Sequence, residues 1–172
     1  YKSVYADKKI DYPMEFHYAI VINKWIFKNF KNKIGIIAGI EKIKVIKELM
    51  NYSEYNNYLG IDYFTDYIEV PEKFSCDNPN ELNNNIKNQL KNAKAEIFLF
   101  GIGISKLIVA YKFKEYHSAI YIDIGICMAG LAGFMTKNRP YALNWTNYRI
   151  KNYDYSNLDK MDITKNENIK YL

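Results

Sequence analysis

Residues 95–125 read AEIFLFGIGISKLIVAYKFKEYHSAIYIDIG, and this stretch decides the fold. A short apolar run ends at Phe100, two glycines and an amphipathic segment follow, and a second apolar run ends at Asp123. Buried runs separated by an amphipathic segment are typical of a β-α-β unit. We therefore expect strands at 96–100 and 119–122 with a helix over 105–115 between them.

The rest of the chain repeats this alternation of apolar runs and amphipathic segments. Strands that are continuous Ile, Phe and Leu runs are typical of a parallel sheet buried on both faces. The sequence therefore predicts an α/β, Rossmann-like fold, with a mostly parallel sheet covered by helices on both faces. The further elements that we expect are helices at 14–30, 41–50 and 80–93, a strand at 34–38, a strand within 61–70 whose core is 67–70, a helix exit and loop at 51–60, and a short helix or tight loop at 126–134.

The length of 172 residues is that of one ordinary globular domain. No linker rich in Pro, Gly or Ser divides the chain, but beyond Lys151 it is dominated by Asn, Asp and Lys. We expect a single Rossmann-like domain over 1–150 and a polar, mobile C-terminal tail over 151–172. Because the chain does not begin with Met, we also expect it to be part of a longer polypeptide.

Composition narrows the classes of partner. No apolar run is long enough for a membrane span. The net charge of +5 comes from lysines interleaved with acids along the whole chain, so we expect no nucleic-acid partner. Cys76 and Cys127 lie far apart and outside any CxxC motif, which predicts two free thiols in a reducing compartment and no zinc site. With no signal-peptide pattern, we expect a cytoplasmic protein.

Two segments of the central stretch fall at the carboxyl ends of its predicted strands: GIGISK at 101–106 and DIG at 123–125. Ligands of parallel sheets bind at this edge, where helix starts offer free N–H groups. Gly101 and Gly103 lack the third glycine of the dinucleotide fingerprint and the spacing of a Walker loop. Either they only allow a sharp turn, or the N–H groups of 103–106 and the Lys106 ammonium bind a diphosphate, with Ser105 as a helix cap or hydroxyl donor.

Asp123 is the one candidate for a catalytic group. A carboxylate at the end of a strand can accept sugar hydroxyls, help to hold a divalent cation or act as a base, and Gly125 gives a ligand room to approach. The alternative is that Asp123 only caps the following turn. The whole site hypothesis requires that Asp123 and the turn after Phe100 lie at the same rim of the sheet.

The remaining polar residues form no diagnostic pattern. We interpret five of them as solvated or capping groups: Glu15, His17, Asp62, Asp66 and His117. A loop near the C-terminus either stacks on a base or sugar or packs over the sheet, and its residues are Arg139, Tyr141, Asn144 and Trp145.

Six segments occur in a fixed order within residues 16–141: the helix FHYAIVINKWIF, the strand KIGIIAG, the VP of EVPEKF, the unit AEIFLFGIGISKLIVAYKF, the strand AIYIDIG and a final RPY. This order resembles the C-terminal part of glycosyltransferases of the GT-D type fold. The resemblance implies transfer of a sugar from a nucleotide-diphosphate sugar to an acceptor glycan or protein, with Gly101, Gly103 and Asp123 at matched motif positions. It also implies a divalent cation, Mn²⁺ or Mg²⁺, near an acidic D-x-E motif. No D-x-E stands at a strand end here, so the motif either precedes residue 1 or has been lost, and the metal ligands stay unassigned.

Two further classes of function fit the sequence. The first is a Rossmann-like binding module without chemistry. The second is an enzyme that uses a nucleotide or S-adenosylmethionine, which needs an acid at the end of the second strand to bind ribose hydroxyls, and Glu69 is the candidate for that role.

Overall fold

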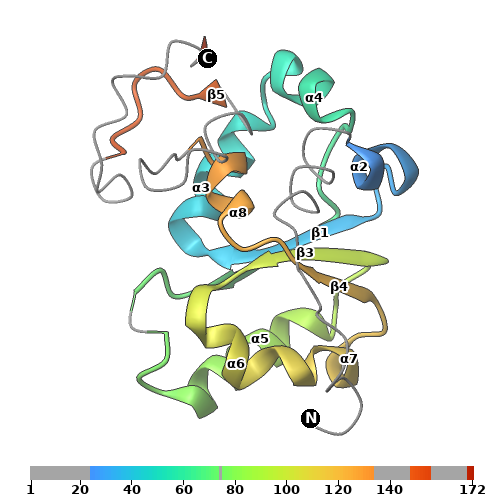
Figure 1. The fold of residues 1–172 in the computed structure, drawn as a ribbon, viewed down its shortest axis with the longest axis vertical. Coiled ribbons are helices and arrows are strands. Elements are labelled where there is room, and N and C mark those ends of the chain that lie inside the picture. Colours follow the sequence, from blue (N-terminus) through green and yellow to red (C-terminus); the bar gives the residue numbers. More distant parts are fainter. Residues whose placement is uncertain (1–23, 74, 134–147, 156–169) are drawn as a thin grey trace, which may run out of the picture.

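The fold is built on a parallel four-stranded sheet with the strand order β2-β1-β3-β4 (Figure 1). The computed structural model describes residues 24–73, 75–133, 148–155 and 170–172. The strands are β1 (Ile34–Gly39), β2 (Asp66–Val70), β3 (Ile97–Gly101) and β4 (Ile120–Asp123). The two central strands are the continuous apolar runs of the sequence, and β1 is buried along its whole length. This confirms the predicted α/β, Rossmann-like fold.

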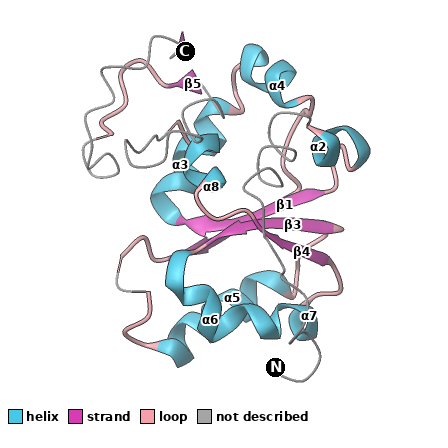
Figure 2. Cartoon of the chain, in the orientation of Figure 1, coloured by secondary structure: helices cyan, strands magenta, loops and turns pink. Residues whose placement is uncertain are grey.

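Helices cover both faces of the sheet (Figure 2). On one face lie α2 (Trp25–Asn29), α3 (Ile40–Leu49), α4 (Ser53–Leu59) and α8 (Cys127–Leu131). On the other lie α5 (Pro79–Leu90) and the segment that follows β3. Each layer has its own apolar cluster, so the sheet separates two cores. None of the helices in the described ranges has the length and apolar character needed to cross a lipid bilayer.

The segment between β3 and β4 differs from the predicted single helix. It consists of four short pieces: η1 (Gly103–Ser105), α6 (Lys106–Val109), η2 (Ala110–Lys112) and α7 (Phe113–Tyr116). The backbone leaves the α-helical region at Val109, where φ is −120°. The adjacent β-branched residues Ile108 and Val109 favour such a break, because branching at Cβ lowers helix propensity.

Two other boundaries also differ from the sequence prediction. The predicted loop at 51–60 contains α4, whose Tyr55 and Leu59 are one helical turn apart and buried against the core. This burial outweighs the low helix propensity of a segment rich in Asn and Tyr. The helix expected over 14–30 is described only from residue 24 onward, where α2 occupies Trp25–Asn29.

One side chain binds the outer edge of β2 at Glu69. The Glu69 N–H donates to Oε1 of Gln89 and the Glu69 carbonyl accepts from Nε2 of the same amide, both at 2.8 Å. Gln89 belongs to α5, which packs beside β2. Its amide therefore satisfies the two backbone groups that Glu69 directs away from β1.

Residues near the C-terminus return to the domain. The strands β5 (Tyr148–Arg149) and β6 (Lys170–Tyr171) pair in parallel, and the Lys151 N–H donates to the Leu172 carbonyl at 2.7 Å. Tyr155 is 7% exposed, and its ring lies 3.8 Å from the Arg149 guanidinium carbon. These parts of the predicted tail pack against the same core as α3 and α4.

Candidate functional site

The strand order places the most favourable ligand position between β1 and β3. These strands are neighbours, but the chain leaves β1 toward α3 on one face and leaves β3 toward α6 on the other (Figure 1). Open α/β sheets bind ligands at such a switch point, outside the carboxyl ends of the strands. Two turns therefore have to be compared: the β1–α3 turn at Gly39 and the β3–α6 turn at residues 101–106.

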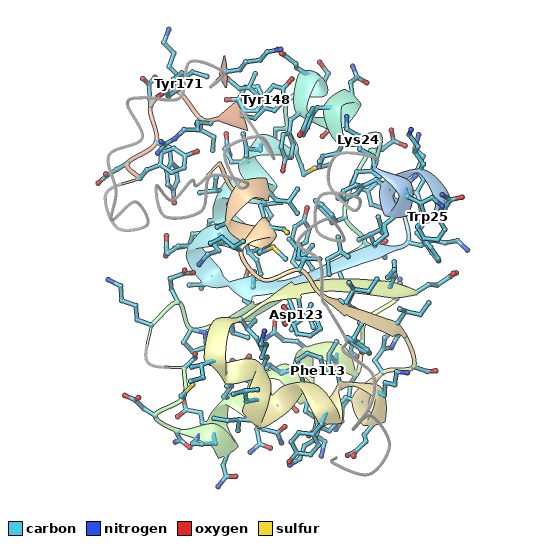
Figure 3. All side chains as sticks on the ribbon, in the orientation of Figure 1. Lys24, Trp25, Phe113, Asp123, Tyr148 and Tyr171 are labelled. Carbon is cyan, nitrogen blue, oxygen red and sulfur yellow. The ribbon has the colours of Figure 1, made fainter. Side chains whose placement is uncertain are left out.

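Lys106 and Asp123 form an ion pair at the rim beside the β3–α6 turn, between Nζ and Oδ2. Asp123 is paired in register with Phe100 of β3, so the ends of the two strands coincide. The side chains of Lys106 and Asp123 are 40% and 33% exposed, and Figure 3 shows Asp123 on the α6 side of the sheet. The structure thus brings the two predicted rim segments together and leaves the pair open to solvent.

Asp123 has a second contact within its own turn. Its Oδ1 accepts a hydrogen bond from the Gly125 N–H at 2.9 Å. Gly125 has φ +48°, a conformation that side chains with Cβ rarely adopt. The turn therefore holds one carboxylate oxygen of Asp123, while the other faces the ammonium.

The two glycines of the GIG motif have different surroundings. Gly101 is packed tightly, because a Cβ there would lie 2.6 Å from the Gly125 carbonyl oxygen and from Cβ of Met128. Gly103 has φ +58°, and a Cβ there would meet nothing within 4 Å. Gly101 thus lets β3 approach the turn after β4, whereas Gly103 leaves backbone accessible at the rim.

The Ser105 side chain does not cap α6, as one of its two predicted roles would require. The residue is only 1% exposed. Its hydroxyl instead bonds to the Ser75 hydroxyl and to Sγ of Cys76 at 3.2 Å. Ser105 therefore ties the β3–α6 turn to the loop that follows β2.

The β1–α3 turn holds a carboxylate that the sequence analysis missed. A Cβ on Gly39 would lie 1.8 Å from Oε2 of Glu72, so the carboxylate occupies the space that a side chain at residue 39 would need. Lys42, in the first turn of α3, pairs with Oε1. Oε2 is buried and makes no hydrogen bond to any residue that the structure describes. Glu72 thus lies at the helix start where a dinucleotide fold binds phosphate.

Two hollows lie at the carboxyl end of β2. One of about 220 Å³ is next to the partner of Ser105 and is lined by Pro71, Ser75, Asp77, Asn78, Glu81, Leu82 and Asn85. The other, of about 460 Å³, is lined by Ile40, Glu69, Val70, Pro71, Asn85, Asn88 and Gln89. Side-chain amide and carboxylate groups line both hollows. Polar atoms therefore lie close to the carboxyl ends of the strands.

The other candidates within the described ranges have structural partners. Asp62 accepts from Asn32 and pairs with Lys31 at 3.2 Å, and these two contacts lower the pKa of its carboxyl group. Asp66 accepts the N–H groups of Lys94 and Ala95.

Three further residues of the sequence analysis also have defined surroundings. His117 Nε2 lies 2.9 Å from the Ala95 carbonyl oxygen, and Glu69 pairs with Lys47 at 2.9 Å. Both cysteines are free thiols, and burial raises the pKa of the Cys127 thiol. The remaining candidates lie outside the described residues, and they are Glu15, His17, Arg139, Tyr141, Asn144 and Trp145.

The donor set at the rim does not fit Mn²⁺ or Mg²⁺. These cations need several oxygen ligands, whereas Asp123 faces an ammonium. The described part of the chain contains no group of three or more His, Cys, Asp or Glu side chains that would hold a metal. We therefore derive no step through a cation. No family model, curated protein sequence or solved structure matches this chain.

Proposed function

We propose that this domain binds a nucleotide-diphosphate sugar and belongs to a glycosyltransferase that moves the sugar to an acceptor glycan or protein. The observation that carries the proposal is the solvent-open Lys106–Asp123 pair between the turns at Gly103 and Gly125. The reaction expels an anionic diphosphate and takes a proton from an acceptor hydroxyl. A cation and a carboxylate side by side provide the two charges that these events need.

In the proposed binding step, the diphosphate lies over the β3–α6 turn. The backbone at Gly103 is accessible there, and Lys106 can turn its ammonium from Asp123 to the phosphate oxygens. This exchange keeps the ammonium paired and releases Oδ2 of Asp123 toward the acceptor. Binding of the donor therefore frees the Asp123 carboxylate to act as the base.

In the proposed transfer step, the acceptor oxygen forms a bond to the anomeric carbon while the bond from that carbon to the diphosphate oxygen breaks. The hydroxyl proton passes to Asp123, and the electron pair of the broken bond stays on the diphosphate. Lys106 stabilises the negative charge that develops there. The Gly125 N–H keeps the Asp123 carboxylate oriented through Oδ1.

The β1–α3 turn favours this assignment over a dinucleotide site. The Glu72 carboxylate stands at the start of α3, so a phosphate there would meet a negative charge and no free space. Glu69, the acid needed to bind ribose, is paired with Lys47. Both observations direct an anionic ligand to the β3 side of the switch point.

Ligand-dependent stabilisation tests the proposal. The protein is heated with UDP- and GDP-sugars, NAD or S-adenosylmethionine, since a ligand that binds only the folded state raises Tm. We expect a nucleotide-diphosphate sugar to raise Tm and Lys106→Gln to reduce the increase, because the variant weakens donor affinity about tenfold, with Lys112→Gln as the matched control. Stabilisation by NAD or S-adenosylmethionine alone would overturn the proposal. Donor binding with no transfer to any acceptor would favour a binding module.

A further inference from the structure

The hollow of about 220 Å³ lies next to the Lys106–Asp123 pair along the rim. The loop between β2 and α5 forms one wall of it, and this loop and the β3–α6 turn are at the same end of the sheet (Figure 1). Ser75 in that wall bonds to the hydroxyl of Ser105, and Ser105 directly precedes Lys106. A ligand over the β3–α6 turn can therefore extend into the hollow.

The side chains that line this hollow suit a neutral ligand with many hydrogen-bonding groups. Among the described residues of the lining there is no Lys, Arg or His, and the carboxylates of Asp77 and Glu81 would repel a phosphate. Leu82 adds apolar surface, and Asn78 and Asn85 add amides. Pockets for small molecules combine apolar walls with a few polar groups of this kind. A nucleoside has no charge and carries hydroxyl, N–H and carbonyl groups.

Two of the four polar side chains face this ligand with hydrogen-bonding capacity to offer. Asn78 and Glu81 bond to each other at the start of α5. The Asn85 carbonyl oxygen accepts from Nε2 of Gln89, so its NH₂ group is the part that can donate to a ligand. The Asp77 carboxylate can accept hydrogen bonds from hydroxyl groups, as acids do that bind ribose in nucleotide sites.

The order of the strands fixes the direction of the donor. A nucleotide-diphosphate sugar is linear, with its diphosphate between the nucleoside and the sugar. The proposed site has the diphosphate over the β3–α6 turn and the anomeric carbon at Asp123, which ends β4. The hollow begins at Pro71, directly after β2, on the other side of β3. The nucleoside end of the donor therefore points toward the hollow. Since β2 and β4 are three strand spacings apart, about 14 Å, the donor lies extended across the rim.

We propose that this hollow binds the nucleoside of the donor, with Asp77 accepting from the ribose hydroxyls and the Asn85 NH₂ group donating to a carbonyl of the base. The hollow of about 460 Å³ shares Pro71 and Asn85 with it, so a base that extends past Asn85 has further room along α5. This inference rests on the proposed function, because the position of the diphosphate comes from it.

A charge-matched pair of variants tests the contact with the base. Asn85→Asp keeps the oxygen that accepts from Gln89 and removes the NH₂ group. Asn84→Asp makes the same change at an exposed neighbour that lines neither hollow. Titration calorimetry measures the Kd of UDP and GDP, and the variants are compared on the tighter of the two. We expect Asn85→Asp to raise this Kd about fivefold more than Asn84→Asp, and both variants to bind inorganic pyrophosphate alike.

A second measurement tests the contact with the ribose. We expect the unmodified protein to bind the tighter nucleotide about fivefold more strongly than its 2′-deoxy form, and Asp77→Asn to lose most of this preference. Equal binding of the two forms by the unmodified protein would remove the ribose from Asp77 and overturn this part of the proposal.

The outcomes separate this inference from the proposed function. If neither UDP nor GDP binds, both are overturned. If Lys106→Gln weakens nucleotide binding while Asn85→Asp and Asn84→Asp bind alike, only the position of the nucleoside is wrong. If Asn85→Asp raises the KM of the acceptor and leaves the Kd of the nucleotide unchanged, the hollow binds the acceptor and the inference is overturned. Circular dichroism and Tm check that each variant folds, and Asn85→Ala with Asn84→Ala replaces the first pair where either does not.

Discussion

The β1–α3 and β3–α6 turns are built from the same sequence pattern, but they differ in what occupies the space beyond the strand. At Gly39 the chain's own carboxylate fills that space, and Glu72 is only 16% exposed. At Gly103 the space is open, and Lys106 and Asp123 face solvent. An apolar run, a glycine and a helix thus establish a turn at the rim. A residue from a distant loop decides whether a ligand can use it.

The largest expected effect comes from Asp123→Asn. The amide keeps the acceptor atom for the Gly125 N–H but cannot take a proton, so we expect the transfer rate to fall about 10²- to 10⁴-fold. Initial rates with saturating donor measure this, and Asp62→Asn is the matched control on another surface. Unchanged rates would show that Asp123 does not act as the base in the transfer step.

The next largest effect is on the affinity for the donor, and it shows which of the two turns binds the diphosphate. Lys106→Gln removes the only charge proposed to contact the diphosphate, so we expect Kd to rise about tenfold. Glu72→Gln alters the β1–α3 turn, where Glu72 fills the space, and is expected to leave the Kd for the donor within about twofold. Titration calorimetry of both variants gives the comparison. If Glu72→Gln weakened binding more than Lys106→Gln, the ligand would lie at the β1–α3 turn.

A smaller effect concerns how much the contacts in the β1–α3 turn stabilise the fold. In Gly39→Ala the new Cβ displaces the Glu72 carboxylate and separates it from Lys42, so we expect unfolding free energy to fall by about 1–2 kcal/mol. Urea denaturation of the single and double variants with Glu72→Ala measures the coupling. Because the clash requires both side chains, the double variant is expected to be more stable than the sum of the single effects. Simple additivity would show that the two positions do not interact.

The smallest effect uses the two thiols as reporters. Cys76 is half-buried and contacts Ser105 in the β3–α6 turn, whereas Cys127 is buried in α8. Burial raises the pKa of Cys127, so this group stays a thiol at pH 8, and only the thiolate reacts with iodoacetamide. We expect Cys76 to be alkylated first, and bound donor to slow it a few-fold. Mass spectrometry of timed samples locates the label, and faster labelling of Cys127 would contradict this order.

The sequence predicts the parts of the fold that follow from local pattern. The apolar runs expected to be strands at 34–38 and 96–100 are β1 (Ile34–Gly39) and β3 (Ile97–Gly101). The meeting of Lys106 and Asp123 also follows, because adjacent parallel strands end at the same rim.

The sequence does not predict contacts between distant loops. Glu72 covers Gly39 and pairs with Lys42, which is 30 residues away. Ser105 is equally distant from its partner Ser75. Such pairs depend on the paths of two loops across the rim, and neither path leaves a periodic signal. For this reason only the structure shows that Glu72 fills the β1–α3 turn.

The Gln89 amide that covers Glu69 has a consequence for assembly. A peptide edge with unsatisfied groups invites a neighbouring molecule to add a strand, which is a route to polymers and aggregates. Here the amide mimics one peptide unit of a fifth strand, and an incoming chain would have to displace two good hydrogen bonds before forming its own. At Glu69 the outer edge of β2 is thereby protected against strand addition.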